Sequence, residues 1–274
     1  MEIRINDKKL DFTIENEKTI GEILSGLDQW LRESGHRFNS LSIDGEAISA
    51  KSIQEVFSRG VESIKVLEIN TASLADLTAL CLINLIDDID EYEKIPYEDK
   101  NFFYTDWKGT PQAVFAQDHL NDVYVLFEST FKNGSIDFST LKSIAKERLR
   151  ETETPVVEFD AMEPIISEIT LRLKDLPLDI QTGRDSCAAQ TIQNFGVITE
   201  KLIRILNQLA IQGTVDAENI MGNLNNFSET VNELYDAYGK HDLVLIGDLA
   251  EYEIAPKLQE LYDIIRMQIK NDSV

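Results

Sequence analysis

The stretch that decides the fold is MEIRINDKKLDFTIENEKTIGEILSGLDQWLRESG (residues 1–35). It begins with strand periodicity, because Ile3 and Ile5 alternate with polar residues and the apolar residues Leu10, Phe12 and Ile14 alternate again after a turn at residues 7–9. Alternation on both sides of a short polar turn predicts a β-hairpin at the start of the chain.

The same stretch then changes to helix periodicity. Thr19 and Glu22 have the spacing of a capping box, and Gly35 is placed to end a helix in the left-handed region. Between them the apolar residues recur every three or four positions: Ile20, Ile23, Leu24, Leu27, Trp30 and Leu31. This spacing predicts one amphipathic helix after the hairpin.

Two more strands are expected before residue 70. Leu41 and Ile43 alternate up to Asp44-Gly45, a favoured hairpin turn that is followed by Ala47 and Ile48. Ser52 with Glu55 marks a short helix, and residues 61–69 contain the apolar residues of a closing strand. The predicted order is strand, strand, helix, strand, short helix, strand.

Residues 1–70 therefore resemble the ubiquitin-like β-grasp fold of small sulfur carriers and modifiers. The resemblance covers about a quarter of the chain. In those families a free carboxyl-terminal Gly-Gly is the working part, whereas here the corresponding stretch is Glu68-Ile69-Asn70-Thr71 and the chain continues. The resemblance implies a fold and no catalytic role, and we expect a recognition or spacing module.

Composition supports a second, larger domain. The chain has 274 residues, 43% of them hydrophobic, which is enough for two cores. We predict an α+β protein with a β-grasp domain at residues 1–70 and a larger all-α antiparallel helical bundle at residues 71–274. Periodic apolar seams predict helices at 73–91, 111–131, 139–151, 157–176 and in the last 90 residues. Pro177 and Gly183 predict a break, Pro256 a kink, and short glycine-containing loops an up-down arrangement.

Charge points to a basic partner. The net charge is −23, and residues 1–70 contribute 9 − 13 = −4, which leaves −19 for the helical part. Binding of nucleic acid or of an anionic membrane requires clusters of cations, so we expect neither partner. An acidic field attracts basic proteins and also keeps an abundant protein soluble.

Carboxylates and aromatic side chains concentrate in one segment. The expected helix at 73–91 ends in Asp87, Asp88, Asp90 and Glu91, where the helix dipole disfavours acids, and Phe102, Phe103, Tyr104 and Trp107 follow shortly after. Two interpretations are open: a partner-binding surface, or a lid packed over the end of the bundle, which the rarity of exposed aromatic clusters favours. Asp248, Glu251 and Glu253 form a second acidic patch.

Motifs for catalysis are absent. His36, His119 and His241 stand in none of the common metal or phosphotransfer motifs, and Cys81 with Cys187 are expected to be buried free thiols. We predict no cofactor and no metal. The chain begins without the basic stretch and apolar core of a signal peptide, which predicts a soluble cytoplasmic protein.

The sequence thus favours a non-enzymatic adaptor, scaffold or chaperone that binds a protein with a basic or helical surface. The predicted contact residues are Asp87, Asp88, Asp90, Glu91, Phe102, Phe103, Tyr104, Trp107, Asp248, Glu251 and Glu253. For Phe103→Ala with Trp107→Ala this hypothesis predicts weaker partner capture at an unchanged melting temperature. The alternative is an enzyme that uses clustered carboxylates or a metal, and the heptad spacing is also compatible with a homodimer.

Overall fold

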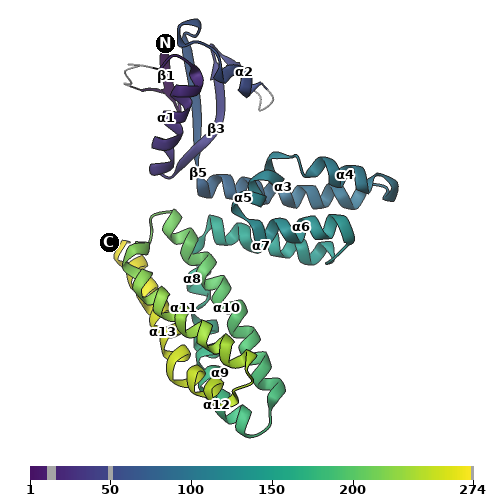
Figure 1. Cartoon of the computed structure of the whole chain (residues 1–274), viewed down its shortest axis with the longest axis vertical. Coiled ribbons are helices and arrows are strands. Elements are labelled where there is room, and N and C mark those ends of the chain that lie inside the picture. The colour runs from purple at the N-terminus through teal and green to yellow at the C-terminus, as the bar shows by residue number, and fades with distance from the viewer. Residues whose placement is uncertain (11–16, 49–51, 273–274) are drawn as a thin grey trace. The chain divides into compact units, whose positions relative to one another are not determined.

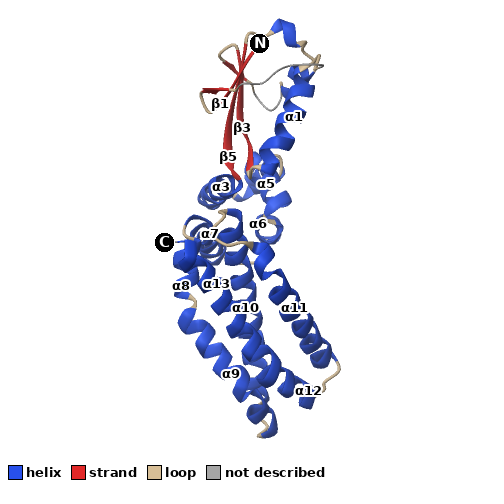
Figure 2. Ribbon diagram, turned by 90° about the vertical axis from the view of Figure 1, so that its left-hand side faces the viewer, coloured by secondary structure: helices blue, strands red, loops and turns tan. Residues whose placement is uncertain are grey.

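A computed structural model describes residues 1–10, 17–48 and 52–272 (Figures 1 and 2). The chain divides into two compact units, residues 1–145 and residues 146–274. The first unit holds a mixed sheet and several helices, and the second is helical, which confirms the α+β class with a larger helical part. The boundary expected after residue 70 stays a prediction.

The sheet has five strands in the order β2-β1-β5-β3-β4. Central strands β1 and β5 are parallel, and the other neighbours are antiparallel. Helix α1 (Ile20–Glu33) covers one face and contributes Ile20, Ile23, Leu24 and Leu27 to the core of this part. Short helix α2 (Ile53–Phe57) adds Val56. The strands are β1 (Glu2–Ile5), β2 (Lys8–Lys9), β3 (His36–Ile43), β4 (Glu46–Ala47) and β5 (Val66–Ser73).

Both hairpin turns are tight. Asn6 and Asp7 have φ of 46° and 63°, which is the type I′ pattern, so the first turn ends sooner than expected. Lys8 and Lys9, predicted as turn residues, instead pair with Ile5 and Arg4. The turn predicted at Asp44-Gly45 is confirmed, and Phe12 and Ile14 lie outside the described residues.

Strand β5 continues directly into helix α3 (Leu74–Lys94). Ser73 is both the last residue of β5 and the N-cap of α3: its Oγ accepts from the amide of Asp76 at 3.0 Å. The Asp76 carboxylate accepts from the Ser73 amide in return, at 3.2 Å. This reciprocal pair satisfies two amides at the strand–helix junction, where no linker residue separates the elements.

The remaining helices of the first unit lie close together in the sequence. The aromatic segment, expected between elements, forms a 3₁₀ turn (Tyr97–Asp99) and helix α4 (Lys100–Trp107). The single helix expected at 111–131 is divided at Leu120, whose φ and ψ are −136° and 47°. The two pieces are α5 (Pro111–His119) and α6 (Asn121–Asn133), and α6 ends at Gly134 with φ of 65°.

Helix α7 (Phe138–Glu153) runs from the first unit into the second, where four long helical segments form an antiparallel bundle (Figure 1). The side chains of Asp216 and Asp242 cap the helices that begin at Ala217 and Leu243. The second core is built from the apolar stripes of the bundle helices, with Leu173, Leu202, Leu234 and Leu258 fully buried. The helices are α8 (Pro155–Ala161), α9 (Glu163–Gln181), α10 (Asp185–Ile211), α11 (Ala217–Gly239), α12 (Leu243–Asp248) and α13 (Ala255–Asp272).

Two prolines behave differently from one another. Pro177 was expected at a break but lies inside α9, because Leu176 before it and Asp179 after it are both buried and keep the helix in place. Pro256 was expected to kink the last helix. It follows a π-helical turn (Leu249–Ile254), a wider turn of the kind that accommodates the hydrogen bond a proline cannot donate.

We predict that Ser73→Ala lowers the free energy of unfolding of the first unit by about 1 kcal/mol, because the first turn of α3 loses its cap. The backbone amide of Asp76, which loses its hydrogen-bond acceptor, should also exchange its hydrogen with solvent faster than in the wild type. Ser25→Ala is the control, since Ser25 is exposed inside α1 and caps nothing. Equal effects of the two substitutions would contradict a capping role for Ser73.

Candidate protein-binding site

The acidic end of α3 is partly tied to neighbouring side chains. Asp88 is half-buried and accepts from the indole Nε1 of Trp107 at 2.9 Å and from the amide of Gln112 at 3.1 Å. Burial raises the pKa of Asp88, while these two hydrogen bonds oppose the rise. Asp90 pairs with Lys142, whereas Asp87 and Glu91 are exposed.

The aromatic segment is mostly a lid. Trp107 is only 2% exposed and stacks on Tyr124 with 5.6 Å between ring centroids. Half-buried Phe103 meets Tyr92 edge-on at 5.4 Å, and the Tyr104 hydroxyl donates to Glu128 at 3.1 Å. Phe102, in contrast, is 76% exposed. Of the four aromatic residues predicted to bind a partner, Phe102 presents its ring to solvent, while Trp107 belongs to the core.

The second predicted patch lies beside an exposed apolar surface at one end of the bundle. Figure 1 shows α12 where α9 and α11 end. Ile246 and Gly247 face inward, but Val244 is 74% exposed and Tyr252, in the π-helical turn, is 65% exposed. We call this the α12 surface and define it by its exposed apolar residues: Leu178, Tyr238, Leu243, Val244, Leu245 and Tyr252.

Local packing brings these residues together. Gly247 lies against Pro177, since a Cβ built on Gly247 would be 3.4 Å from three atoms of the proline, and this contact brings α12 next to Leu178. Val244, Asp248 and Tyr252 succeed one another at intervals of four residues along the helix. The carboxylate of Asp248 therefore lies within the apolar surface and is exposed.

Acids surround the α12 surface. Residues 236–253 contain five carboxylates and one lysine. Asp242 and Asp248 are exposed, and Glu253 pairs with Lys257 at 2.9 Å. Glu251 and, more weakly, Asp248 raise the pKa of the Tyr252 hydroxyl, which reports a negative field at this place. Sequence reasoning selected Asp248, Glu251 and Glu253 but missed the apolar part, although four consecutive apolar residues from Leu243 exceed what one helix face can bury.

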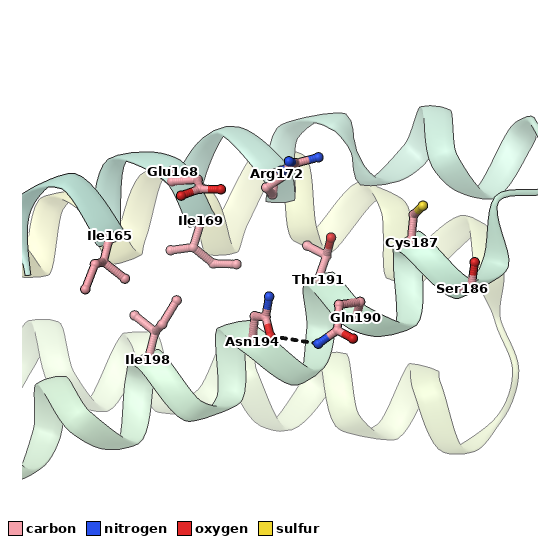
Figure 3. A pocket seen from close by; sticks show the side chains of 10 residues that line it. All are labelled: Ile165, Glu168, Ile169, Arg172, Ser186, Cys187, Gln190, Thr191, Asn194 and Ile198. Carbon is pink, nitrogen blue, oxygen red and sulfur yellow. Dashed lines mark hydrogen bonds between the residues drawn. The ribbon is translucent and has the colours of Figure 1, made fainter.

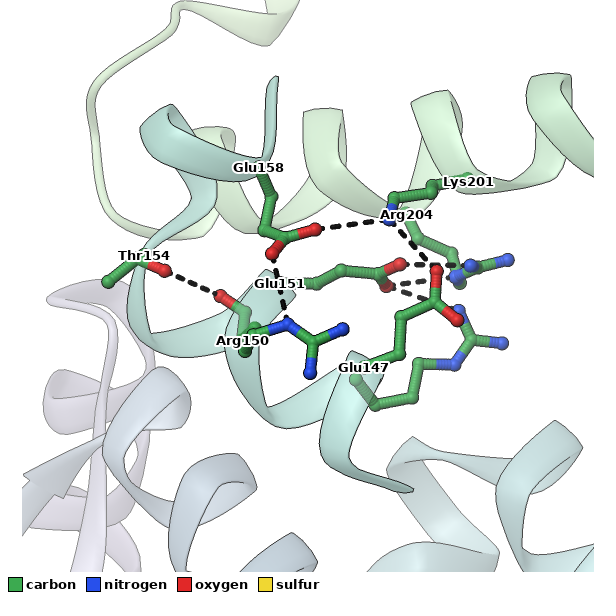
Figure 4. A network of polar contacts seen from close by, with 8 residues as sticks. Glu147, Arg150, Glu151, Thr154, Glu158, Lys201 and Arg204 are labelled. Atoms are coloured by element: carbon green, nitrogen blue, oxygen red, sulfur yellow. Dashed lines mark hydrogen bonds and ion pairs between the residues drawn. The ribbon is translucent and has the colours of Figure 1, made fainter. Parts of the chain in front are cut away.

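A second polar cluster lies inside the helical unit (Figure 4). Glu151 is 2% exposed and accepts two hydrogen bonds from Arg204, at 2.9 and 3.0 Å, and one from Arg148 at 3.3 Å. Lys201 bridges Glu147 and Glu158 at 2.9 and 3.0 Å. Burial raises the pKa of Glu151 to about 7, and Arg148 opposes that rise. The network joins α7, α8 and α10 through paired charges, and we interpret it as structural.

No cluster of three or more His, Cys, Asp or Glu suited to a metal occurs among the described residues. Cys81 is buried, and burial raises the pKa of its thiol to about 12. Cys187, expected to be buried, is exposed in the first turn of α10. Of the helices in the described part of the chain, none has the length and apolarity to cross a membrane.

Comparison with known proteins finds relatives for two segments. A family described as the TP0873 N-terminal domain matches residues 1–73, which end at the last residue of β5, and a domain of unknown function (DUF8042) matches residues 159–264. An uncharacterized protein of Treponema pallidum (strain Nichols) is 30% identical over 80 residues, or 29% of this chain and 40% of that protein. The match thus spans less than half of the relative. No solved structure matches the chain.

Trp107→Ala should lower the free energy of unfolding by about 3–5 kcal/mol, because it empties a buried site and removes the donor to Asp88. Phe102→Ala is the matched control and should change stability by less than about 0.5 kcal/mol. Urea denaturation followed by circular dichroism measures both values. Loss of partner binding by Trp107→Ala without loss of stability would restore the interface interpretation.

Glu151 should make stability fall as pH rises. Its pKa is about 7 in the folded state against an ordinary 4.5, so the folded state holds the proton more tightly. The resulting stabilisation is present below about pH 4.5 and is lost by about pH 7, a change of about 3 kcal/mol.

The measurement is the free energy of unfolding of wild type and of Glu151→Gln between about pH 5 and about pH 8. The wild type should lose stability relative to the variant as pH rises. Glu153→Gln should keep the wild-type pH dependence, because Glu153 is exposed on the same helix and does not contribute to the raised pKa of Glu151. Parallel pH profiles of wild type and Glu151→Gln would show that Glu151 does not titrate in this range.

Proposed function

We propose that this protein is a non-enzymatic adaptor whose α12 surface binds a basic amphipathic segment of a partner protein. The observation that carries the proposal is the exposed apolar cluster at Leu243, Val244, Leu245 and Tyr252, set among carboxylates. Large exposed apolar patches with polar surroundings are characteristic of interaction sites.

The shape of the surface suits a helical segment. Val244 and Tyr252 are two helical turns apart, and Leu178 and Tyr238 extend the apolar area onto α9 and α11. An amphipathic helix places apolar residues at intervals of three and four along one face, which matches an elongated apolar strip. Apolar burial supplies affinity at the centre of such a contact, and the surrounding charges select the partner.

The charge of the partner follows from the acids around the strip. Asp242, Asp248 and Glu251 would each face a like charge if the partner were acidic, which costs free energy in a contact that excludes water. Lysine or arginine side chains on the partner would instead pair with them. The net charge of −23 adds a long-range attraction that speeds association and weakens with salt.

For the first unit we propose a ubiquitin-like β-grasp arrangement. The strand order β2-β1-β5-β3-β4 with parallel β1 and β5, and α1 packed across the sheet, supports this proposal. Since β5 leads directly into α3, the segment that carries Gly-Gly in transferable modifiers is here part of a capped helix junction. The module is then a recognition element. We also propose a cytoplasmic location, which the two free cysteines support.

The test uses a fluorescent amphipathic peptide of about 18 residues made of leucine and lysine, with a leucine and glutamate peptide as the charge-reversed probe. Fluorescence anisotropy should show binding of the basic peptide and none of the acidic one. Val244→Ser with Tyr252→Ser should weaken binding at least tenfold, and Asp248→Asn with Glu251→Gln should reduce its dependence on salt.

Val157→Ser is the control, because Val157 is 64% exposed in the same unit but lies on α8, away from the α12 surface. Unchanged affinity of Val244→Ser with Tyr252→Ser would contradict the proposal, and so would equal binding of both peptides. Sedimentation of the chain alone separates one further outcome: dimerisation that Val244→Ser abolishes would make this surface a self-association interface instead.

A further inference from the structure

A groove between α9 and α10 is separate from the α12 surface and shares no residue with it (Figure 3). Its volume is about 570 Å³, within the range of sites that hold small organic molecules. The groove has two chemically different ends. Ile165, Ile169 and Ile198 line one end, and polar side chains of both helices line the other.

A hydroxyl that lines the groove has no partner within the protein. Thr191 is 6% exposed, yet its hydroxyl makes no hydrogen bond with any residue that the structure describes. Three of the other buried threonines, Thr130, Thr152 and Thr230, donate to the carbonyl four residues earlier in their helices. Figure 3 shows the Thr191 hydroxyl directed toward α9, across the groove. The Thr191 hydroxyl is therefore free to hydrogen-bond a ligand in the groove.

Opposite charges lie unpaired on the other wall. Glu168 and Arg172 are one turn apart on α9 and both line the groove, but neither makes an ion pair or a hydrogen bond within the described part of the chain. Such an exposed pair gains little from direct contact, so the two groups are available to a ligand that carries both charges. On α10, the side-chain amide of Gln190 donates a hydrogen bond to that of Asn194 at 2.8 Å, and both amides line the groove.

The order of these groups along α9 defines a ligand. Ile165 and Ile169 come first, Glu168 lies beside them, and Arg172 follows toward the polar end. We infer that this groove binds a free amino acid with an aliphatic or aromatic side chain. The side chain lies against Ile165, Ile169 and Ile198, the ammonium group pairs with Glu168, and the carboxylate accepts from Arg172 and the Thr191 hydroxyl.

The charges that line the groove favour a ligand with both an ammonium group and a carboxylate. A simple carboxylate would leave Glu168 facing a negative charge, and an amine would leave Arg172 and Thr191 without an acceptor. A zwitterion avoids both penalties. The apolar side chain adds selectivity, since burying it against three isoleucines removes apolar area from water.

The experiment is isothermal titration calorimetry of the full chain with L-leucine and L-phenylalanine as probes. 4-Methylpentanoate lacks the ammonium group of leucine, and 3-methylbutylamine lacks its carboxylate. We expect at least one amino acid to bind, and to bind at least tenfold more tightly than either truncated analogue. Arg172→Gln should weaken binding about 10- to 100-fold through loss of a charge-assisted contact, and Thr191→Val about three- to tenfold.

Lys174→Gln is the matched control, because Lys174 carries the same charge on the exposed side of α9 and does not line the groove. It should bind the probes as the wild type does. Absence of binding by both amino acids up to about 10 mM would overturn the inference. So would equal affinity for an analogue that lacks one charge, or an Arg172→Gln variant that binds as tightly as Lys174→Gln.

Discussion

The end of the helical bundle depends on the close contact between Gly247 of α12 and Pro177 of α9. A Cβ at residue 247 would stand 3.4 Å from three atoms of the proline, which is the lower limit of ordinary van der Waals contact. A side chain that extends beyond Cβ toward the proline would therefore have to displace α12. With the glycine in place, α12 lies close to α9 and turns Ile246 into the core. Leu243, Val244 and Leu245 are left on the outside, which creates the apolar part of the α12 surface.

The π-helical turn before Pro256 determines which of the following residues reach the surface. It passes the chain from short α12 into α13 while Leu249, Ala250 and Ile254 remain buried. The residues between these buried positions, Glu251, Tyr252 and Glu253, face outward or sit at the rim. A backbone adjustment that a proline favours thus gathers an aromatic ring and carboxylates next to an exposed apolar turn.

Periodicity predicted the elements well where one face is buried. The helix at Ile20, the turn at Asp44-Gly45 and the caps at Asp216 and Asp242 follow from local rules. Local rules failed where tertiary packing outweighs them. Pro177 stays inside a helix because residues on both sides of it, Leu176 and Asp179, are buried. Trp107 is buried because α6 supplies Tyr124 and Phe127 as stacking partners, which no spacing within residues 87–107 reveals.

The sequence predicted the acidic residues of the candidate site but not its apolar residues, and the reason is physical. Acids are visible in a sequence wherever they lie, so Asp248, Glu251 and Glu253 were identified before their surroundings were known. Exposure of an apolar residue is a property of packing, and a run such as Leu243-Val244-Leu245-Ile246 fits a buried strand, a buried helix or an exposed turn equally well. The contact of Gly247 with Pro177 decides among them. A charged patch alone is a solvated surface, and the exposed apolar residues beside it are the basis of the proposed partner binding.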